Sequence, residues 1–360
     1  MSAPRVLITG ASGYLGGHVA ARLLDNTDAT LLLAVRSAAA REELQRALGA
    51  HGSRIAFLDL DLAAPDPAAQ VGDDDLVDVT HVVHSAAVTR FNVERELAEQ
   101  VNIEGTRRVV ALARRCPRLE SFGHASTLYS TGLRSGPLSE QLYDDGGFAN
   151  FYEWSKWHAE NLVAAADDLP WRILRIATVV ADGDSGRITQ YNAFHETLKL
   201  CFYGLLSLLP GRETTPLYLV TGDFATEALV AIVTAPSARG VFHVSHDRAA
   251  APTLREVLDI VFTRFELAED FRRKRILRPL LADKASFDLL VEGVSPMAGG
   301  LVTQALSNVS PFAHQLYVDK EVDTSRMQAA FRPPPGDVRD VVASAVHTLV
   351  ETRWGRRASA

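Results

Sequence analysis

Cysteine is scarce in this sequence. Only Cys116 and Cys201 occur among the 360 residues, and they lie far apart without the spacing of a metal site or a CxxC pair. We therefore expect both to behave as small buried apolar side chains rather than as a disulfide. This usage indicates a reducing, cytoplasmic setting, and we expect no metal site.

A hydrophobic run long enough to cross a membrane is also missing. The most apolar stretch, residues 198–209, falls short of the roughly 20 residues that a bilayer requires, and it suits a buried helix or a pocket wall better. Residues 5–8 already have a strand pattern, which leaves no room for a secretory signal. We expect neither a transmembrane segment nor export.

An excess of positive charge is absent as well. The formal net charge is -7, although Arg353, Arg356 and Arg357 form a short basic tail. Nucleic acid is therefore not an expected partner. The hydrophobic fraction of 47% and the charged fraction of 22% are typical of a folded globular protein rather than of a disordered chain.

Short apolar runs alternate with helical patterns through the first half of the chain. Strands are expected at RVLIT, LLLAV, RIAFLDLDL, VTHVVHSAA, 121–125 and 171–176, and helices from about residue 14, at 41–48, at 95–115 and at 152–166. Nearly continuous apolar strands separated by helices indicate a parallel sheet covered on both faces. The predicted fold class is α/β, a Rossmann-type doubly wound parallel sheet.

The regular alternation ends after Ala181. A Gly/Asp turn follows, then an aromatic-rich helical stretch at 191–209, two regions at 217–233 and 240–244 that are sheet-like or helix-like, and a mainly helical remainder from about 253. We predict a Rossmann domain at 1–185, with 215–245 returning to it. Residues 186–214 and 246–360 are expected to form a smaller, mainly helical substrate-binding lobe.

The segment TGASGYLG follows the first strand and opens a helix. Gly10 permits the tight turn, Gly13 lets the backbone approach a pyrophosphate and Gly16 allows close packing of helix on strand, so that phosphates sit at the helix N-terminus. Ser12, Tyr14 and Leu15 of the same loop are further predicted cofactor contacts. A dinucleotide site is therefore expected here.

The end of the second strand favours NADP(H). A site that prefers NAD usually places an Asp or Glu there, whereas this sequence has Arg36-Ser37. Arg36 can pair with a 2′-phosphate, and Arg41 is a second candidate for that role.

Two further strand ends contribute expected cofactor contacts. Asp61, with Leu62, follows the third strand and could accept from the adenine amino group, while Asp59 is the alternative one pleat earlier. At the fourth strand, the small residues of the run Ser85-Ala86-Ala87 would let the cofactor lie close. His84 is expected to be a packed, hydrogen-bonded histidine rather than a catalyst.

Tyr152 and Lys156 are four residues apart on a predicted helix and so share a face. A tyrosine with a pKa near 10 is a poor acid or base at neutral pH, and a neighbouring lysine cation is expected to lower that pKa. Lys156 can also hold the nicotinamide ribose. These two residues are predicted to be catalytic and to contact the cofactor.

Taken together, these motifs resemble the extended short-chain dehydrogenase/reductases. The resemblance covers about the first 245 residues and rests on TGASGYLG, Asp61-Leu62, HSAA, NIEGT, Ser126-Thr127, YEWSK and Arg175. It implies a catalytic Thr127, Tyr152 and Lys156, with Ser126 as the alternative to Thr127. It also implies that Asn102 touches the cofactor or orders the site; bracing a helix is its alternative role.

Within that superfamily, HSAAVTRFN, NIEGT, STLYSTG and YEWSKWHAE most resemble the branch of fatty acyl-CoA reductases and thioester-reductase domains of carboxylic acid reductases. The resemblance implies NADPH-dependent reduction of an acyl thioester, bound to coenzyme A or to an acyl carrier protein, to an aldehyde. Where that branch often has Arg-Pro-Ser, this chain has Arg175-Ile176-Ala177, and Ala177 is a predicted cofactor contact.

Other functions remain open at this point. The same residues could reduce an aldehyde or ketone, or serve an epimerase or dehydratase, although Arg36 argues against the last two. A non-catalytic NADP-sensing protein is a further alternative, against which Tyr152 and Lys156 argue.

The substrate pocket is the least specified part. Phe194, Leu198, Phe202, Tyr203 and Leu206 recur at helical spacing and could wall a tunnel, although such a stripe is more often core. Residues 294–312 could form a lid over the acyl group.

Overall fold

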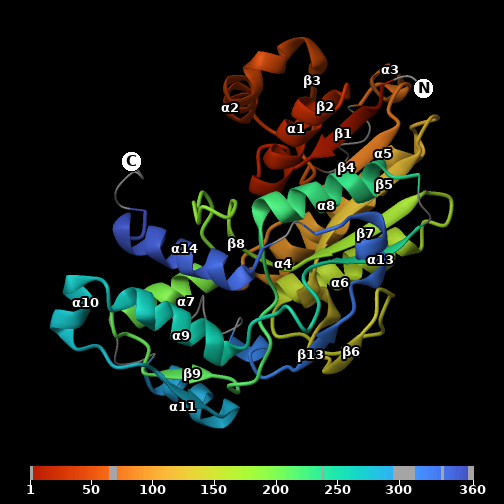
Figure 1. Ribbon diagram of the computed structural model, residues 1–360. Coiled ribbons are helices and arrows are strands. Elements are labelled where there is room, and N and C mark those ends of the chain that lie inside the picture. The colour runs from red at the N-terminus through yellow and green to blue at the C-terminus, as the bar shows by residue number, and fades with distance from the viewer. Residues whose placement is uncertain (1–2, 65–70, 237–238, 295–312, 334–335, 356–360) are drawn as a thin grey trace.

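The computed structural model describes residues 3–64, 71–236, 239–294, 313–333 and 336–355. Its centre is a seven-stranded parallel sheet in the order β11-β7-β5-β4-β1-β2-β3. The strands are β1 (Arg5–Thr9), β2 (Thr30–Val35), β3 (Ile55–Asp59), β4 (His81–His84), β5 (Ser121–Thr127), β7 (Trp171–Ile176) and β11 (Gly240–Val244). The strand order reverses between β1 and β4, so the predicted doubly wound α/β fold is confirmed (Figure 1).

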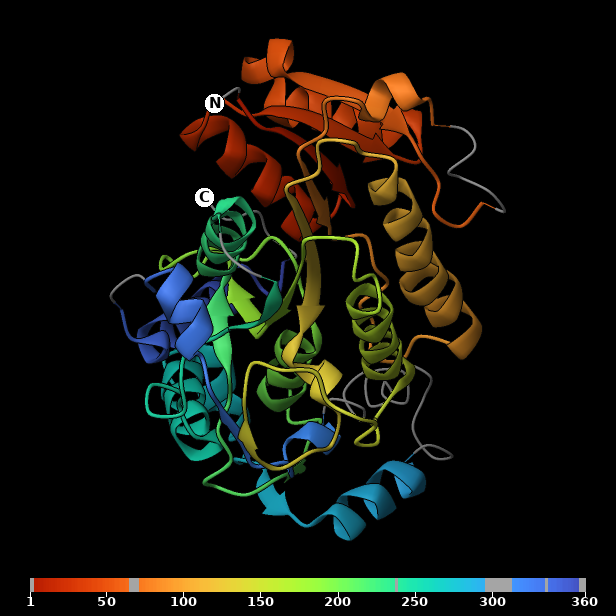
Figure 2. The same cartoon turned by 90° about the vertical axis from the view of Figure 1, so that its right-hand side faces the viewer.

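Helices cover both faces of the sheet. One buried apolar cluster joins the sheet to α1 (Tyr14–Asn26), α2 (Ala38–Leu48) and α8 (Gly222–Thr234). A second cluster joins the opposite face to α3 (Asp73–Leu76), α5 (Gly105–Arg114) and α6 (Phe151–Ala164). Figure 2 shows α1 and α8 on one side of the strands and α5 and α6 on the other. The strands are buried on both faces, which explains their nearly continuous apolar sequences.

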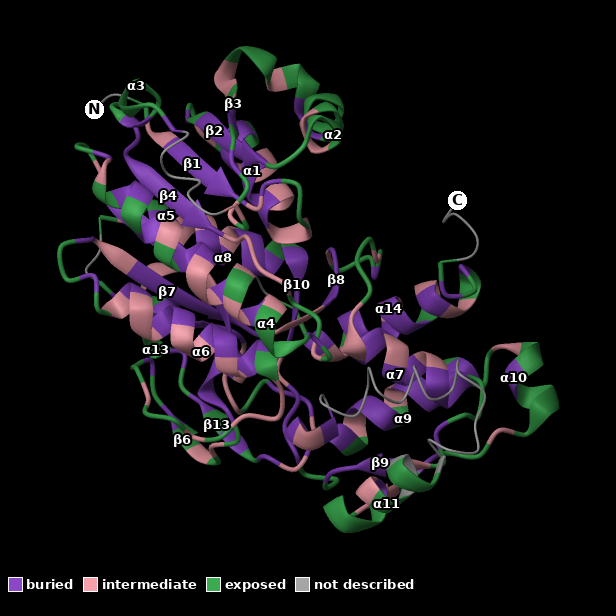
Figure 3. Cartoon of the chain, turned by 180° about the vertical axis from the view of Figure 1, so that it is seen from behind, coloured by how far each residue is buried: buried purple, intermediate pink, exposed green. Residues whose placement is uncertain are grey.

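The C-terminal part packs around a third apolar cluster. Its helices are α7 (Ala193–Phe202), α9 (Leu254–Phe265), α10 (Glu269–Lys274), α11 (Lys284–Val294) and α14 (Val338–Glu351). Phe202, Phe265 and Trp354 meet at its centre, with ring centroids of Phe202 and Phe265 5.0 Å apart. Figure 3 shows this group of helices beside the sheet, with their buried faces turned toward one another.

Three short parallel strand pairs lie outside the central sheet. β8 (Thr178–Ala181) pairs with β10 (Leu219–Thr221), β9 (Leu208–Pro210) with β12 (Leu280–Ala282), and β6 (Gly136–Leu138) with β13 (Lys320–Val322). The remaining helices are α4 (Arg95–Ala98) and α13 (Ser325–Ala330). Strand β13 of the C-terminal part pairs with β6 of the sheet domain, so the C-terminal part does not fold as an independent unit.

Several predicted elements differ in detail. The helix predicted at 95–115 is interrupted by a π-helix at Glu99–Glu104. The helix predicted at 191–209 ends at Phe202, and the ambiguous region at 217–233 consists of β10 and α8. The predicted lid at 294–312 lies, beyond Val294, outside the described residues. Short strands formed by tertiary pairing account for most of these differences, because they have too few residues to show a period of two.

Cys116 and Cys201 are buried and unpaired, as predicted. Within the described part of the chain, no helix is long and apolar enough to cross a membrane.

Candidate active site

The glycine-rich loop joins β1 to α1 at the carboxyl edge of the sheet. Gly10 has a φ of +73°, and a Cβ added there would lie 2.6 Å from the backbone nitrogen of Ala86. A Cβ on Gly16 would collide with the carbonyl oxygen of Gly10. Both positions therefore require glycine, and the loop lies directly against the run that follows β4.

The N-terminus of α1 is open to an anion. Its N-cap is Gly13, no side chain caps the first turn, and that turn contains no acidic residue. The first N–H groups of a helix carry partial positive charge and need partners, so this end fits the pyrophosphate of a dinucleotide.

Helix α6 carries both Tyr152 and Lys156. The helix begins beside them because the Asn150 side chain accepts a hydrogen bond from the backbone N–H of Glu153 at 3.0 Å. Tyr152 is 9% exposed and Lys156 is 3% exposed, so both polar groups lie at the inner end of a pocket. The ring of Phe91 packs edge-on against Tyr152, with centroids 5.5 Å apart.

Lys156 is held by strand β5. Its Nζ donates to the carbonyl oxygen of Ala125 at 2.8 Å and lies 3.2 Å from Nε2 of His124. Burial lowers the pKa of Lys156 to about 8, and the nearby Glu160 opposes that change. Its ammonium group is therefore the main form at neutral pH.

The prediction that Lys156 lowers the pKa of Tyr152 is wrong for this structure. Burial raises the pKa of Tyr152 to about 12, against a smaller lowering by its hydrogen bond with Thr127. Lys156 is turned toward β5 instead, where Ala125 and His124 bind it. Tyr152 is consequently a neutral phenol at pH 7 and can donate a hydrogen bond.

Thr127 and Ser126 end strand β5 but have different partners. The Thr127 oxygen accepts a hydrogen bond from the backbone N–H of Tyr129 at 3.3 Å, and the Thr127 side chain is also hydrogen-bonded with that of Tyr152. Ser126 donates to Glu160 instead. The structure therefore gives the hydroxyl of Thr127, and not that of Ser126, to the neighbourhood of Tyr152.

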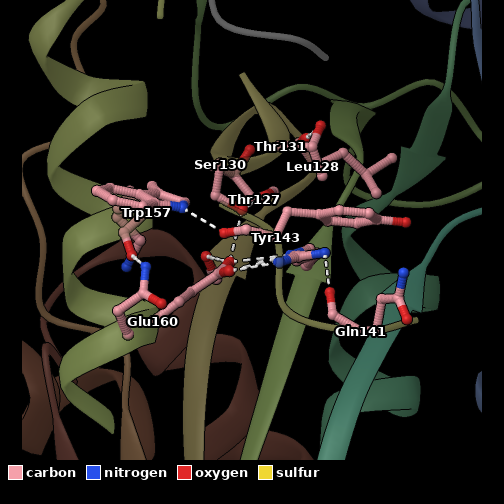
Figure 4. Close-up of polar contacts among 12 residues, drawn as sticks. Thr127, Leu128, Ser130, Thr131, Gln141, Tyr143, Trp157 and Glu160 are labelled. Atoms are coloured by element: carbon pink, nitrogen blue, oxygen red, sulfur yellow. Dashed lines mark hydrogen bonds and ion pairs between the residues drawn. The ribbon is translucent and has the colours of Figure 1, made fainter. Parts of the chain in front are cut away.

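A buried ion pair lies beneath this strand end (Figure 4). Arg175 on β7 donates to both oxygens of Glu160 on α6, at 3.1 Å and 2.7 Å, and their side chains are 0% and 1% exposed. Ser126 and Ser130 also donate to Glu160. Burial would raise the pKa of Glu160, but the charge and hydrogen bonds of Arg175 outweigh it and hold that pKa below its usual value.

Asn102 lies in the π-helical segment and is 1% exposed. Its side chain accepts from the backbone N–H of Val88 at 2.8 Å and donates to the Val88 carbonyl and to Ser155 Oγ, at 3.0 Å and 2.9 Å. It therefore ties the segment after β4 to α6. These contacts fit both ordering of the site and the alternative role of bracing a helix.

A cavity of about 520 Å³ connects the glycine loop with the Tyr152 side chain. The predicted site residues that line it are Gly10, Gly13, Tyr14, Leu15, Gly16, Ser85, Ala87, Thr127, Tyr152, Lys156 and Ala177. Residues from β8 and from the start of α7 form its other side, including Val179, Ile188 and Phe194. The cavity thus spans the uncapped N-terminus of α1, three polar side chains and an apolar wall.

The other predicted site residues do not line this cavity. They are Ser12, Arg36, Asp61, Leu62, Ala86 and Asn102. Arg36 is exposed just past β2 and forms no ion pair with the described residues. Asp61 lies two positions beyond the end of β3 and accepts a hydrogen bond from Ala63 N–H at 2.9 Å. Arg41, the second candidate for a phosphate, is paired with Asp59 at 2.6 Å.

His84 is a packed histidine, as expected. It is 1% exposed, and its ring nitrogens lie 2.7 Å from Thr9 Oγ1 and 3.0 Å from Thr106 Oγ1. Burial lowers its pKa to about 3, so it stays neutral.

The apolar stripe predicted as a possible tunnel wall is mostly core. Leu198, Phe202 and Leu206 belong to the C-terminal apolar cluster, and Tyr203 is 37% exposed. Phe194 is the member of the stripe that lines the cavity.

Sequence reasoning missed several residues of the site. Asp182 lines the cavity and accepts a hydrogen bond from the predicted Tyr14 at 3.0 Å, which joins the glycine loop to the residues that follow β8. Tyr129 and Phe91 also line the cavity. Phe91 and Tyr129 lie in the motifs HSAAVTRFN and STLYSTG, so the sequence could have indicated them. For Asp182 the sequence showed a position in a Gly/Asp turn and no motif.

Comparison with known proteins places the chain in a family. Residues 8–229 match the family model described as male sterility protein, an NAD-binding family. Among curated relatives, the isonitrile lipopeptide synthase of Streptomyces coeruleorubidus is 29% identical over 215 residues, which are 54% of this chain and 14% of the relative. The fatty acyl-CoA reductase wat of Drosophila melanogaster is 23% identical over 63% of this chain and 53% of its own. The chain therefore spans about half or less of these relatives.

Solved structures share the fold. The terminal R domain of the myxalamid PKS-NRPS pathway superposes with a TM-score of 0.77 at 20% identity, over 100% of this chain and 93% of that one. A thiolation-reductase di-domain of an archaeal non-ribosomal peptide synthetase superposes with a TM-score of 0.72 at 17% identity, over 98% of this chain and 76% of that one. The UDP-glucuronic acid 4-epimerase of Bacillus cereus, bound to NAD, superposes with a TM-score of 0.66 at 18% identity, over 97% of this chain and 99% of that one.

The matched region contains the glycine loop, the Tyr152 and Lys156 helix and the strands between them. This protein belongs to the male sterility, NAD-binding family of extended short-chain dehydrogenase/reductases, which are NAD(P)-dependent oxidoreductases.

Proposed function

We propose that this protein is an NADPH-dependent reductase that converts an acyl thioester to an aldehyde and a free thiol. The observation that carries the proposal is the cavity itself, which joins a phosphate-binding helix end to Thr127, Tyr152 and Lys156 and continues along apolar side chains. Fatty acyl-CoA reductases and an NRPS terminal R domain among the similar proteins support this reaction class.

We assign residues 1–185 and 215–245 to cofactor binding and residues 186–214 and 246–360 to a substrate lobe. Strand β11 and helix α8 on the Rossmann sheet, and the separate apolar cluster of α7, α9 and α14, support this division.

The cofactor fits the residues present. The uncapped N-terminus of α1 would hold the pyrophosphate, and Lys156 would hold the nicotinamide ribose. When bound, NADPH supplies the hydride that reduces the acyl carbon. Arg36, which is exposed and is not paired with any described carboxylate, would bind the 2′-phosphate, whereas Arg41 is already paired with Asp59.

The side chains of this site suit a developing oxyanion. Tyr152 keeps its proton because its pKa is raised to about 12, so it can donate to the acyl oxygen, and Thr127, whose side chain is hydrogen-bonded with that of Tyr152, would donate to the same oxygen once the substrate is bound. Collapse of the tetrahedral hemithioacetal then breaks the carbon–sulfur bond, and the thiolate takes up one proton. The ammonium of Lys156 adds positive charge nearby. A donor that stays protonated stabilises an oxyanion better than a phenolate would.

The test is NADPH oxidation by purified protein with octanoyl-pantetheine, with thiol release measured in parallel. We expect equal amounts of NADPH consumed and thiol released while the aldehyde is trapped, and a loss of kcat of about 100-fold to 1,000-fold in Tyr152→Phe. Tyr129→Phe is the matched control, because its hydroxyl also faces the cavity but is bonded to Thr178 at 2.9 Å. Consumption with aldehydes or ketones alone would reassign the protein to carbonyl reduction, and binding without turnover would make it a sensor.

The cofactor assignment has its own variant. Arg36→Ala is expected to raise the KM for NADPH about tenfold or more, because one charge-assisted hydrogen bond contributes roughly 1.5–3 kcal/mol, and to leave the KM for NADH unchanged. Arg41→Ala is the comparison. An equal rise in the KM for NADPH and for NADH would show that Arg36 does not bind the 2′-phosphate.

A further inference from the structure

A second surface of the molecule combines basic and apolar side chains. Residues 272–275 (Arg-Arg-Lys-Arg) and Arg278 are all exposed, within a chain whose net charge is -7. Among the described residues, Arg273 pairs with Asp270 and Arg278 with Asp259, whereas Arg272, Lys274 and Arg275 form no ion pair. Three cations on this surface therefore have no carboxylate partner in the described part of the chain.

Large apolar side chains are also exposed in the segments on either side of α10 and in α11. The four most exposed large hydrophobic residues described in the chain are Leu277, Leu280, Leu289 and Leu267, at 85%, 70%, 68% and 64%. Tyr203 and Leu205 lie beside them, since Lys274 Nζ is 5.5 Å from the Tyr203 ring and β9 pairs with β12. Exposed apolar groups surrounded by charge mark interaction surfaces.

This surface, which we call the α10 surface, lies at the outer end of α7. The first residues of α7 line the cavity, and Tyr203 directly follows its last residue, so the two sites are separated by a helix of 10 residues (Figure 3). Such a helix is about 15 Å long. A flexible arm attached to a partner on this surface could therefore reach the cavity.

We propose that the α10 surface is the docking site for an acidic carrier protein that presents its acyl group as a thioester on a flexible arm. This inference rests on the proposed function. Charge complementarity identifies the partner as acidic, and the exposed leucines require it to offer apolar side chains as well. Exposed acidic residues directly precede the basic run, namely Glu266, Glu269 and Asp270, and a protein partner with mixed charge accommodates them better than an anionic lipid surface does.

The backbone at Arg275 is consistent with this role. Arg275 caps the C-terminus of α10 with a φ of +49°, a conformation that favours glycine. The arginine therefore stands where local backbone preference alone would select another residue.

The experiment compares one acyl group in two forms, octanoyl-pantetheine and octanoyl-loaded acyl carrier protein. In the triple variant R272E/K274E/R275E, we expect kcat/KM for the carrier-bound form to fall at least about tenfold, because charge complementarity governs the rate of encounter. The value for octanoyl-pantetheine should stay within about twofold, which also shows that the variant is folded. The advantage of the carrier-bound form should decrease with ionic strength.

A matched variant carries the same charge change elsewhere. R107E/R114E/R239E replaces three exposed arginines of the sheet domain and should retain the carrier preference. The docking proposal is overturned if kcat/KM for the carrier-bound substrate falls equally in both triple variants, or does not fall in R272E/K274E/R275E. The proposed function still holds in that case if the protein reduces octanoyl-pantetheine. If the wild-type protein reduces neither substrate, both the docking proposal and the proposed function are wrong. Binding to vesicles of anionic phospholipid that is lost in R272E/K274E/R275E, without an effect on the carrier-bound substrate, would assign the surface to membranes instead.

Discussion

At the scale of single residues, the orientation of Lys156 differs most from expectation. Its ammonium points to Ala125 and His124 on β5. His124 is 0% exposed, its ring lies 5.2 Å from that of His84, and its Nδ1 has no hydrogen-bond partner among the described residues. Burial, with smaller contributions from Lys156 and His84, holds the pKa of His124 well below its usual value. Nε2 of a neutral His124 can therefore accept a hydrogen bond from the Lys156 ammonium.

This contact leads to a pH prediction. In His124→Phe the Lys156 ammonium loses an acceptor, so its pKa should fall below about 8 by roughly one unit, since a hydrogen bond to a charged group contributes about 1.5–3 kcal/mol. A step that needs the charged lysine is complete below that pKa and lost above it, so the alkaline limb of kcat/KM should move to lower pH. The measurement is the pH profile of NADPH oxidation.

The control for that profile is His124→Gln, which retains an amide acceptor and should restore the limb toward the wild-type position. An unchanged limb in His124→Phe would mean that His124 only fills space beside Lys156.

At the scale of elements, the Glu160–Arg175 ion pair joins α6 to β7 and, through Ser126 and Ser130, to the end of β5. It fixes the helix that carries Tyr152 relative to the turn that carries Thr127. Arg175 also donates to the Gln141 carbonyl at 2.9 Å, and Trp157 donates to the Tyr143 carbonyl at 2.8 Å (Figure 4). The loop around residues 139–143 is thereby tied to the same helix.

Glu160→Gln is expected to destabilise the protein by roughly 3–5 kcal/mol, because it leaves the Arg175 charge buried without compensation. The folded-state pKa of Glu160 lies below its usual value, so the stabilisation of the wild type is present above pH 4.5 and lost as the pH falls below it. Urea unfolding at several pH values measures both effects.

Asp168→Asn is the matched control, because Asp168 also binds an arginine through two hydrogen bonds, but on the surface. It should change stability little. The double variant Glu160→Gln/Arg175→Met should recover part of the loss, and equal losses in the single and double variants would argue against an uncompensated charge.

At the scale of the whole molecule, a buried polar chain connects the C-terminal part to α6. Lys320 Nζ donates to Gln315 Oε1 at 3.0 Å and to Thr131 Oγ1 at 3.1 Å, and Gln315 donates to Glu153 Oε2 at 2.9 Å. Burial lowers the pKa of Lys320 to about 8, whereas burial raises the pKa of Glu153. Each charge is disfavoured by burial and partly compensated by the other.

Lys320→Met is expected to reduce stability at pH 7 by roughly 3 kcal/mol, because Glu153 loses the opposite charge. The loss should shrink at acid pH, where Glu153 binds a proton. In the wild type the folded state holds the Lys320 proton less tightly than the unfolded chain, so stability should rise between about pH 8 and 10.5, and this rise should be absent in the variant.

Lys284→Met is the control for this prediction, since Lys284 pairs with Asp288 while 58% exposed. If Lys284→Met and Lys320→Met lower the free energy of unfolding equally, the buried hydrogen bonds of Lys320 do not stabilise the contact between the C-terminal part and α6.

Much of the fold could be predicted because its signals are local. The apolar runs that became β1, β2 and β4 are buried on both faces and needed no partner to be recognised, and the glycines of residues 10–16 are required by backbone contacts within one turn. The four-residue spacing of Tyr152 and Lys156 follows from the helix period alone. The amino-acid sequence by itself therefore determined the Rossmann sheet, the glycine-rich loop and the position of Tyr152 and Lys156 on one helix.

Tertiary structure decided the properties that depend on burial and on distant partners. The raised pKa of Tyr152, the contact of Lys156 with His124 and the pairing of Glu160 with Arg175 arise only when α6 packs on β5 and β7. The short strands β9, β12 and β13 likewise exist only as pairs with segments far away in the chain. Burial of a side chain and pairing with a distant segment depend on tertiary packing, and a local sequence pattern carries no information about either. For that physical reason these properties could be read only from the folded molecule.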